Sequence, residues 1–373
     1  LYANNSDWFY NEGGNIILCP PDNWNDSYYS TRCAFTNYLP AFDFYNPTAR
    51  QWSINDAVWW AKEFDIDGYR LDAIKHVPME WLTELRTRLN AEYPDPTGGR
   101  FYLVGETYDF DSQQTLKDFI DPSTKLDGQF DFVLYHGVSY NTFAYGDKGM
   151  LHADYWVQHG LSKWPEGAVM TPYIGSHDTA RFASLADYRG QDAAHERWIT
   201  GNQWDNLATA PTDAEPYRRI RIAMTWLLGL PGAPLLYYGD EYGQWGGVDP
   251  NNRMMWREMG ALTADELETL TYIRKLGTAR RNLPALHHGA YISLGATEDN
   301  LVFARYDAST GDVAIVGLTR ATTAQPTTVY VASLGLTEGT VLYDHLSSYT
   351  VTVAADLTIT IDLPASSGLV LAP

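Results

Sequence analysis

Cysteines, basic residues and extended apolar segments are all scarce in this chain of 373 residues. Lysine and arginine together number 26 against 46 acidic residues, and the resulting formal charge of -20 repels nucleic-acid phosphates and anionic membranes. No apolar segment is long enough to cross a bilayer. We therefore expect a soluble globular protein that has neither nucleic acid nor membrane as a partner.

Several signatures of catalysis are also missing. The sequence contains no glycine-rich phosphate loop, no H-E-x-x-H or paired C-x-x-C zinc spacing, and no G-x-S-x-G nucleophile turn. Phosphoryl transfer, zinc hydrolysis and serine esterase chemistry therefore have no support in the sequence.

The two cysteines, Cys19 and Cys33, lie close together in a region rich in glycine, asparagine and proline that shows little periodicity. They form either a local disulfide that ties an irregular loop or a pair of free thiols. We favour the disulfide, which implies an oxidising compartment and hence a secreted, extracellular protein.

Acidic residues stand at the ends of three apolar segments that we interpret as buried strands. Residues 68–71 precede Asp72, residues 101–105 precede Glu106, and residues 170–175 precede Asp178. In a parallel α/β barrel the catalytic side chains lie at the carboxyl ends of the strands. A single acid of this kind would be interpreted equally well as an ordinary ion pair, but three of them predict one catalytic site.

Arg70 strengthens this prediction for the first acid. It is two residues before Asp72 on an extended segment, so both side chains point to the same face of the strand. A guanidinium in that position keeps a carboxylate ionised and oriented.

The residues around the three acids resemble the signature regions of the α-amylase family, glycoside hydrolase family 13. In the family's order, residues 68–77 read GYRLDAIKHV, residues 104–108 read VGETY, and residues 174–181 read IGSHDTAR. Two further stretches, GAPLLYYGDE at residues 232–241 and DPNNR at residues 249–253, are also similar to that family. The resemblance extends over roughly residues 35 to 255.

The resemblance implies an α/β fold, a (β/α)8 TIM-type barrel with an irregular loop domain and a C-terminal antiparallel β-sandwich. We expect the loop domain, inserted after the third barrel strand, over residues 1–50, the remainder of the barrel over 51–285, and the β-sandwich over 286–373. The last assignment also has support from the short alternating strands, rich in Val and Thr, that begin near Tyr291. The first barrel strands are missing from this chain, so we expect a preceding segment or a second polypeptide to supply them.

By resemblance, Asp72 is the nucleophile, Glu106 the general acid and base, and Asp178 a third carboxylate that binds ring hydroxyls. The implied reaction is the retaining, endo-type hydrolysis of α-1,4 bonds in starch, glycogen or maltooligosaccharides. One alternative is an α-1,4-glucan transglycosylase of the cyclodextrin-forming or maltogenic type, in which a sugar hydroxyl replaces water. Another is a non-catalytic amylase-like binding subunit, although such relatives tend to lose the acids.

Seven further residues are expected to bind substrate. They are Arg70, Lys75, His76, Tyr108, His177, Asp249 and Arg253. Lys75 and His76 resemble groups on the leaving-group side of the family's cleft, and the alternative is a solvated helix start. Asp249 and Arg253 could instead form a structural ion pair, the less favoured alternative, and Tyr108 could equally well pack rather than stack on a sugar.

The family's structural calcium site is matched only in part. Where the family usually has an aspartate after the proline of its loop-domain motif, this chain has Ala41, which offers no side-chain oxygen. The backbone carbonyl of His76 is a ligand by resemblance, and the family's asparagine ligand would lie in the missing front segment. Calcium is therefore compatible with the sequence but not supported by it. A fungal-type branch of the family has a disulfide similar to the one we favour for Cys19 and Cys33.

Overall fold

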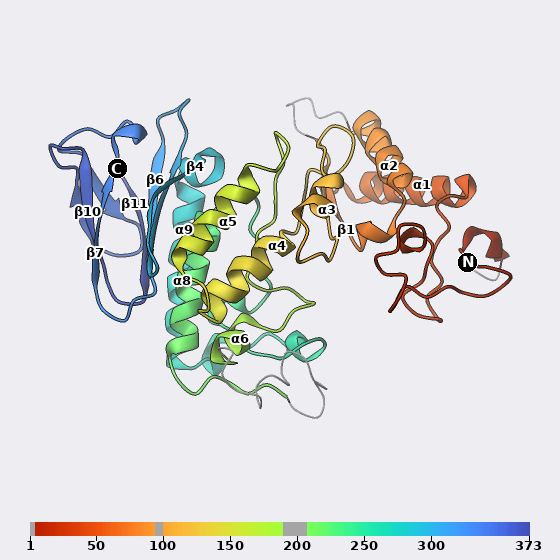
Figure 1. Cartoon of the computed structure of the whole chain (residues 1–373), viewed down its shortest axis with the longest axis horizontal. Coiled ribbons are helices and arrows are strands. Elements are labelled where there is room, and N and C mark those ends of the chain that lie inside the picture. The colour runs from red at the N-terminus through yellow and green to blue at the C-terminus, as the bar shows by residue number, and fades with distance from the viewer. Residues whose placement is uncertain (1–3, 94–99, 189–206) are drawn as a thin grey trace. The chain divides into compact units, whose positions relative to one another are not determined.

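The computed structural model describes residues 4–93, 100–188 and 207–373 (Figure 1). The chain forms two compact units. Unit 1 comprises Leu1–Phe130 and Trp164–Met170, and unit 2 comprises Asp131–Lys163 and Thr171–Pro373. The described part of the chain contains no helix with the length and apolar character needed to cross a membrane.

Unit 1 begins with an irregular region, as predicted. Its regular elements are the short 3-10 helices η2 (Ser6–Trp8) and η3 (Tyr29–Thr31). Cys19 and Cys33 form a disulfide, which confirms the favoured alternative. Backbone hydrogen bonds join the same two chain segments, because Cys19 N donates to Ala34 O at 2.9 Å and Ala34 N donates to Ile17 O at 2.8 Å.

Alternating helices and parallel strands follow in unit 1. In chain order they are α1 (Pro47–Phe64), β1 (Gly68–Leu71), η4 (Ile74–His76), α2 (Met79–Glu92), β2 (Tyr102–Gly105), α3 (Gln113–Asp118) and β3 (Gly128–Gln129). The strands form one parallel sheet in the order β1-β2-β3. Helix α1 starts where Asn46 accepts a hydrogen bond from Thr48 N and a proline occupies the first turn. The apolar spacing in the sequence predicts helices over residues 48–61 and 79–89, and both are present and slightly longer.

A fully buried ion pair holds this sheet in place. Arg86 Nη2 lies 2.5 Å from Asp127 Oδ2, and neither side chain is more than 1% exposed. The same carboxylate oxygen accepts a hydrogen bond from Leu103 N at 2.7 Å, and Arg86 Nη1 donates to Phe101 O at 2.7 Å. The pair therefore joins α2, β2 and the segment leading into β3.

Unit 2 begins with helices. In chain order they are α4 (Phe132–Leu134), the π-helix η5 (Tyr135–Ala144), α5 (Met150–Leu161), α6 (Phe182–Tyr188), α8 (Glu215–Gly229), η6 (Asp240–Tyr242), η7 (Asn251–Arg253), η8 (Met259–Ala261), α9 (Ala264–Asn282) and α10 (Pro284–His288). Helix α9 has a complete capping box, in which Thr263 and Glu266 accept each other's backbone N–H groups.

The sequence also predicts barrel strands over residues 126–134 and 234–238, and these two and the strand expected over 170–175 are much shorter in the structure. The strand expected over residues 126–134 is only β3, because Asp131 Oδ1 accepts a hydrogen bond from Leu134 N at 3.0 Å and starts α4. The strands expected over 170–175 and 234–238 meet in a single parallel bridge between Tyr173 and Leu235. Apolar composition alone does not distinguish a buried strand from a buried irregular segment.

The end of unit 2 is antiparallel. A six-stranded sheet runs in the order β4 (Ala290–Ala296), β5 (Asn300–Tyr306), β6 (Val313–Thr319), β11 (Ser367–Ala372), β8 (Val341–Asp344) and β9 (Thr350–Thr352). Strands β10 (Thr358–Leu363) and β7 (Gln325–Tyr330) form a second sheet, and η9 (Ala332–Leu334) follows β7. The side chains of Val302, Ile315, Val329 and Ile361 belong to one buried cluster that both sheets share. These are the blue strands of Figure 1, and they confirm the predicted C-terminal β-domain.

Candidate active site

Neighbouring strands bring Asp72 and Glu106 together in unit 1. Leu71 pairs with Gly105 at the carboxyl ends of β1 and β2, and Glu106 N donates to Leu71 O at 3.0 Å. The two acids therefore leave the sheet at the same level, at the ends of neighbouring strands. This is the arrangement that the two strand-end acids predicted.

Arg70 contacts both carboxyl groups. Its Nη1 forms an ion pair with Asp72 Oδ1, and its Nη2 lies 2.6 Å from Glu106 Oε2. The guanidinium also lies over the Phe130 ring, 5.6 Å from the centroid. One cation therefore orients two acids, whereas the sequence suggested only the contact with Asp72.

Burial makes the two acids unequal. The Glu106 side chain is 8% exposed, whereas that of Asp72 is 69% exposed. Burial raises the pKa of Glu106 to about 7, the Arg70 charge opposes this rise, and the hydrogen bond and charge of Asp72 add to it. Glu106 thus retains a proton up to neutral pH, as a general acid requires, while Asp72 offers a more accessible oxygen.

Ala73 is a part of this group that the sequence did not reveal. Its backbone is left-handed, with φ of 47°, and its N–H group lies 3.4 Å from Glu106 Oε2. Ile74 N donates to Glu106 O at 2.9 Å. Such a backbone is uncommon for a residue with a Cβ atom and is typical of functional sites, but no side-chain pattern signals it in advance.

Lys75 and His76 are held by the irregular region rather than solvated. Lys75 Nζ donates to Asn25 Oδ1 at 3.1 Å, and His76 Nδ1 lies 2.7 Å from Ser30 O. Burial lowers the pKa of both side chains, and for His76 the contact with Ser30 opposes that effect. The alternative of a freely solvated helix start is therefore not what the structure has.

A cavity of about 230 Å³ in unit 1 reaches this group. Asp72 and His76 contribute to its wall, and most of the remaining lining is apolar, including Phe35, Phe42 and Phe44.

Tyr108 is exposed, has a left-handed backbone and contacts Phe110 edge-on at 5.0 Å. The stacking of Tyr108 on a sugar stays a prediction.

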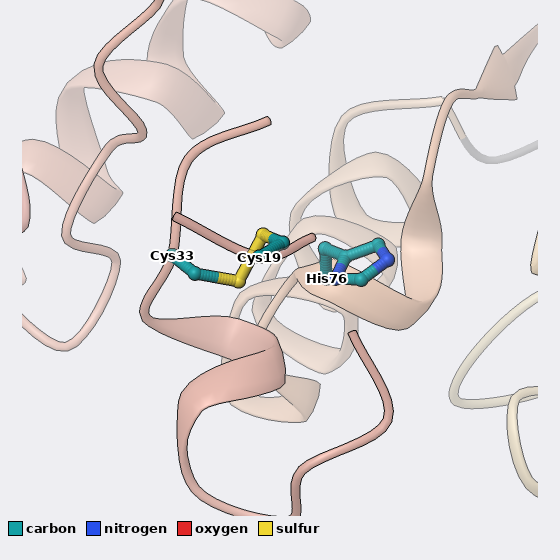
Figure 2. A group of neighbouring side chains, drawn as sticks. All are labelled: Cys19, Cys33 and His76. Carbon is teal, nitrogen blue, oxygen red and sulfur yellow. A yellow bond between two sulfur atoms is a disulfide. The ribbon is translucent and has the colours of Figure 1, made fainter. Parts of the chain in front are cut away.

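Metal binding near His76 gains no support from the side chains there. Figure 2 shows the imidazole beside the Cys19–Cys33 disulfide, and these three residues are the group of potential ligands that the described residues bring within 4.8 Å of one another. The disulfide removes both thiolates that a metal would need. Ala41 O accepts a hydrogen bond from Tyr10 N at 2.9 Å. Calcium held by the His76 carbonyl stays a prediction from resemblance.

Unit 2 gathers the other predicted residues into a second group. Asp178 Oδ2 lies 3.0 Å from His177 Nε2, and Asp178 Oδ1 lies 3.4 Å from Arg253 Nη2. Arg253 also forms an ion pair with Asp249. Four residues from two distant motifs therefore meet.

Buried residues that the sequence analysis left without a role support this second group. Arg181 pairs with Asp240 at 3.1 Å, and its guanidinium lies 3.9 Å from the centroid of the Tyr237 ring. Burial raises the pKa of Asp240 to about 6, against the opposing effect of Arg181. Asn252 Nδ2 donates to His177 O at 2.7 Å and to Thr179 O at 2.8 Å. Each of these residues lies inside a motif that resembles the family's. Their charged and amide side chains within those motifs were the signal by which the sequence could have identified them.

Comparisons with known proteins agree with these features. The family model "Alpha amylase, catalytic domain" matches residues 3–272. A maltogenic alpha-amylase of Bacillus acidopullulyticus is 27% identical over 287 residues, which are 75% of this chain and 40% of that protein. A cyclomaltodextrin glucanotransferase of Geobacillus stearothermophilus is 26% identical over 293 residues, which are 76% of this chain and 35% of that protein.

A solved structure has the same fold. The chain is similar to an alpha-amylase from Anoxybacillus with a TM-score of 0.78 and 25% identity, over 100% of this chain and 72% of that one. The chain spans 40% or less of the length of the two curated relatives.

Proposed function

The chain belongs to the α-amylase catalytic-domain family, and from this premise we propose that it hydrolyses α-1,4-glucosidic bonds with retention at the anomeric carbon. The family's catalytic domain is a (β/α)8 barrel, and the parallel β1-β2-β3 sheet has its acids where such a barrel carries its chemistry. The proposed substrates are starch, glycogen and maltooligosaccharides, cleaved internally.

The observation that carries this proposal is the shared contact of Arg70 with a buried Glu106 and an exposed Asp72. Retaining glycosidases need two carboxyl groups about 5 to 5.5 Å apart, one protonated and one nucleophilic. Two carboxyl groups that share one guanidinium and differ in burial fit those two roles.

In the first step Asp72 attacks the anomeric carbon, and Glu106 gives its proton to the bridging oxygen as that bond breaks. A covalent glucosyl ester on Asp72 and a free leaving sugar result. Glu106, now ionised, then takes a proton from water, and the hydroxide formed attacks the ester, which releases the second sugar and restores both acids. Arg70 keeps the nucleophile oriented while charge moves between the two carboxyls.

The residues of unit 2 have supporting roles in the proposal. Asp178 and His177 would bind hydroxyl groups of the reacting sugar, and Asp249 and Arg253 would bind sugars further along the chain. The disulfide supports secretion, because such bonds persist in oxidising compartments.

Transglycosylation is the second candidate, and the similarity to a cyclomaltodextrin glucanotransferase favours it specifically. In that reaction a sugar hydroxyl replaces water in the second step. A non-catalytic binding role would not need Glu106 to be buried against Arg70.

Substitution of the two acids tests the proposal. In the full-length protein, Asp72→Asn and Glu106→Gln should each lower the release of reducing ends from soluble starch by about 10³-fold. Glu63→Gln, which changes an exposed acid of α1 in the same unit, serves as the matched control and should retain parental activity. Parental rates in both acid variants would show that the catalytic assignment is wrong.

Product analysis separates hydrolysis from transfer. With maltoheptaose as the sole substrate, hydrolysis gives linear products shorter than seven units. Dominant longer or cyclic products would replace hydrolysis with transglycosylation as the function.

A further inference from the structure

Residues 19–33 form a loop that is closed by the disulfide and ordered from within. Asn23 N donates to Cys19 O at 2.8 Å, and Ser30 N donates to Asp26 O at 3.0 Å. The Asp26 carboxylate accepts hydrogen bonds from Tyr28 N and Tyr29 N, both at 2.8 Å. The disulfide loop, as we call residues 19–33, is therefore a preformed structure and not a slack connection.

Lys75 is held by two side chains of this loop. Its Nζ donates to Asn25 Oδ1 at 3.1 Å and lies 5.2 Å from the centroid of the Trp24 ring. A free lysine samples many rotamers, and fixing it in advance removes that entropy cost from substrate binding. The loop thus supplies both a hydrogen-bond acceptor and an aromatic face to one ammonium group.

His76 is enclosed by the same loop. Its Nδ1 lies 2.7 Å from Ser30 O, and its ring centroid lies 4.4 Å from that of Trp24 and 5.0 Å from that of Phe35. Ser30 O is also 3.6 Å from Cys33 Sγ, and Figure 2 shows the imidazole next to the disulfide. The disulfide, the Ser30 carbonyl and the imidazole therefore form one continuous set of contacts.

These contacts lie close to the two acids of the proposed reaction. Lys75 and His76 are three and four residues after Asp72, and η4, which contains both, starts directly after the left-handed Ala73 that donates to Glu106. His76 and Asp72 line the same cavity. These contacts therefore link the disulfide loop to groups beside the acids.

We propose that the disulfide loop determines specificity on the leaving-group side, because Asn25, Trp24 and the Ser30 carbonyl position Lys75 and His76 for the departing sugars. Asn25, Trp24 and Ser30 are positioning residues in this proposal, which rests on the proposed function. The ligand class is the reducing-end portion of an α-glucan, whose hydroxyls an ordered ammonium and imidazole can recognise.

Asn25→Ala tests the proposal on substrate of defined length. Loss of a hydrogen bond to a charged group should raise KM for maltoheptaose about fivefold, with kcat within about twofold of the parent. With maltoheptaose labelled at its reducing end, cleavage should move toward bonds nearer the label, because fewer sugars then need the weakened side. Asn15→Ala, which removes an exposed asparagine of the same region while its backbone bonds to Glu12 stay, is the matched control.

A double-mutant cycle assigns the effect to the Asn25–Lys75 contact. In a Lys75→Ala background, Asn25→Ala should change neither KM nor the cleavage pattern further. Equal effects of Asn25→Ala with and without Lys75 would overturn the proposal even if the protein is an active hydrolase.

Chemical labelling tests the same contact without any activity. Lys75 should react with trace acetic anhydride several-fold faster in Asn25→Ala than in the parent, as followed by mass spectrometry of the peptide, while Asn15→Ala leaves the rate unchanged. Identical rates in the parent and Asn25→Ala would overturn the positioning role. If starch is not a substrate, the proposed function fails, yet labelling still decides whether the loop holds Lys75.

Discussion

The site groups of the two units share a pattern and differ in burial. In unit 1 Arg70 contacts Asp72 and Glu106, and in unit 2 Arg253 contacts Asp178 and Asp249. One arginine thus serves two acids in each group. However, Glu106 is 8% exposed, whereas Asp178 and Asp249 are 32% and 49% exposed.

Burial therefore turns the same ion-pair pattern into different chemistry. An exposed acid beside a guanidinium keeps a fixed charge, whereas a buried acid loses hydration on ionising and can hold a proton at neutral pH. Glu106 has a pKa raised to about 7 for this reason. In the proposed mechanism, Glu106 of unit 1 transfers the proton, and the charged residues of unit 2 bind the substrate.

The largest expected effect contrasts Glu106→Gln with Asp178→Asn on two substrates. Glu106→Gln should slow starch hydrolysis by about 10³-fold but slow the first step of an aryl maltoside with a good leaving group far less, because that group departs without a proton. Asp178→Asn should slow both substrates by similar factors. Burst and steady-state rates measure this, and an equal loss on both substrates in Glu106→Gln would contradict the acid role.

The next largest effect is on stability, and it tests whether a buried ion pair of this protein stabilises the fold more than an exposed one. Arg86→Ala takes the buried guanidinium away from Asp127, whose other carboxylate oxygen keeps only the partly exposed Arg100, and should lower the free energy of unfolding by about 3 kcal/mol. Urea denaturation measures the change. A loss below about 1 kcal/mol would mean that buried and exposed pairs in this protein do not differ.

The pH dependence of kcat/KM should reflect the ionisation of Glu106. Because the proton donor is lost as Glu106 ionises, kcat/KM should fall about tenfold per pH unit above pH 7. Asp178→Asn should retain this basic limb at the same pH. A parental profile that stays flat to pH 9 would contradict a donor with a pKa near 7.

Stability should follow the same titration. The pKa of Glu106 is about 7 in the folded protein against an ordinary value of 4.5, so its stabilising contribution is complete below pH 4.5 and is lost as pH rises through 7. The stability of the parent relative to Glu106→Gln should therefore fall by on the order of 3 kcal/mol between pH 4.5 and 8. Parallel urea midpoints across that range would exclude the raised pKa.

The smallest effect concerns the exposed pair of unit 2. Arg253→Ala should lower the free energy of unfolding by less than about 1 kcal/mol, since the Arg253 and Asp249 side chains are 43% and 49% exposed. When the change in KM for maltoheptaose is converted to a free energy, it should exceed the change in the free energy of unfolding. A stability loss as large as that of Arg86→Ala would assign this pair a structural role.

Local patterns predicted much of the fold and the site. A helix is present where one was expected over residues 48–61, and Asp72 and Glu106 follow parallel strands, both as the sequence indicated. Prediction failed where a distant or polar contact overrode composition. Asp131 ended the expected strand by capping α4, and Tyr173 and Leu235 meet in one bridge rather than in long strands.

The order of residues alone determined which side chains are the candidates for the chemistry, because strand-end acids and motif spacing are short-range properties of the chain. Tertiary structure decided what each of them can do. The proton affinity of Glu106 depends on burial and on Arg70 and Asp72, and the placement of Lys75 and His76 depends on a loop 50 residues earlier at Asn25. Solvent exclusion and contacts between distant segments arise only when the chain packs, since water access is a property of the assembled surroundings.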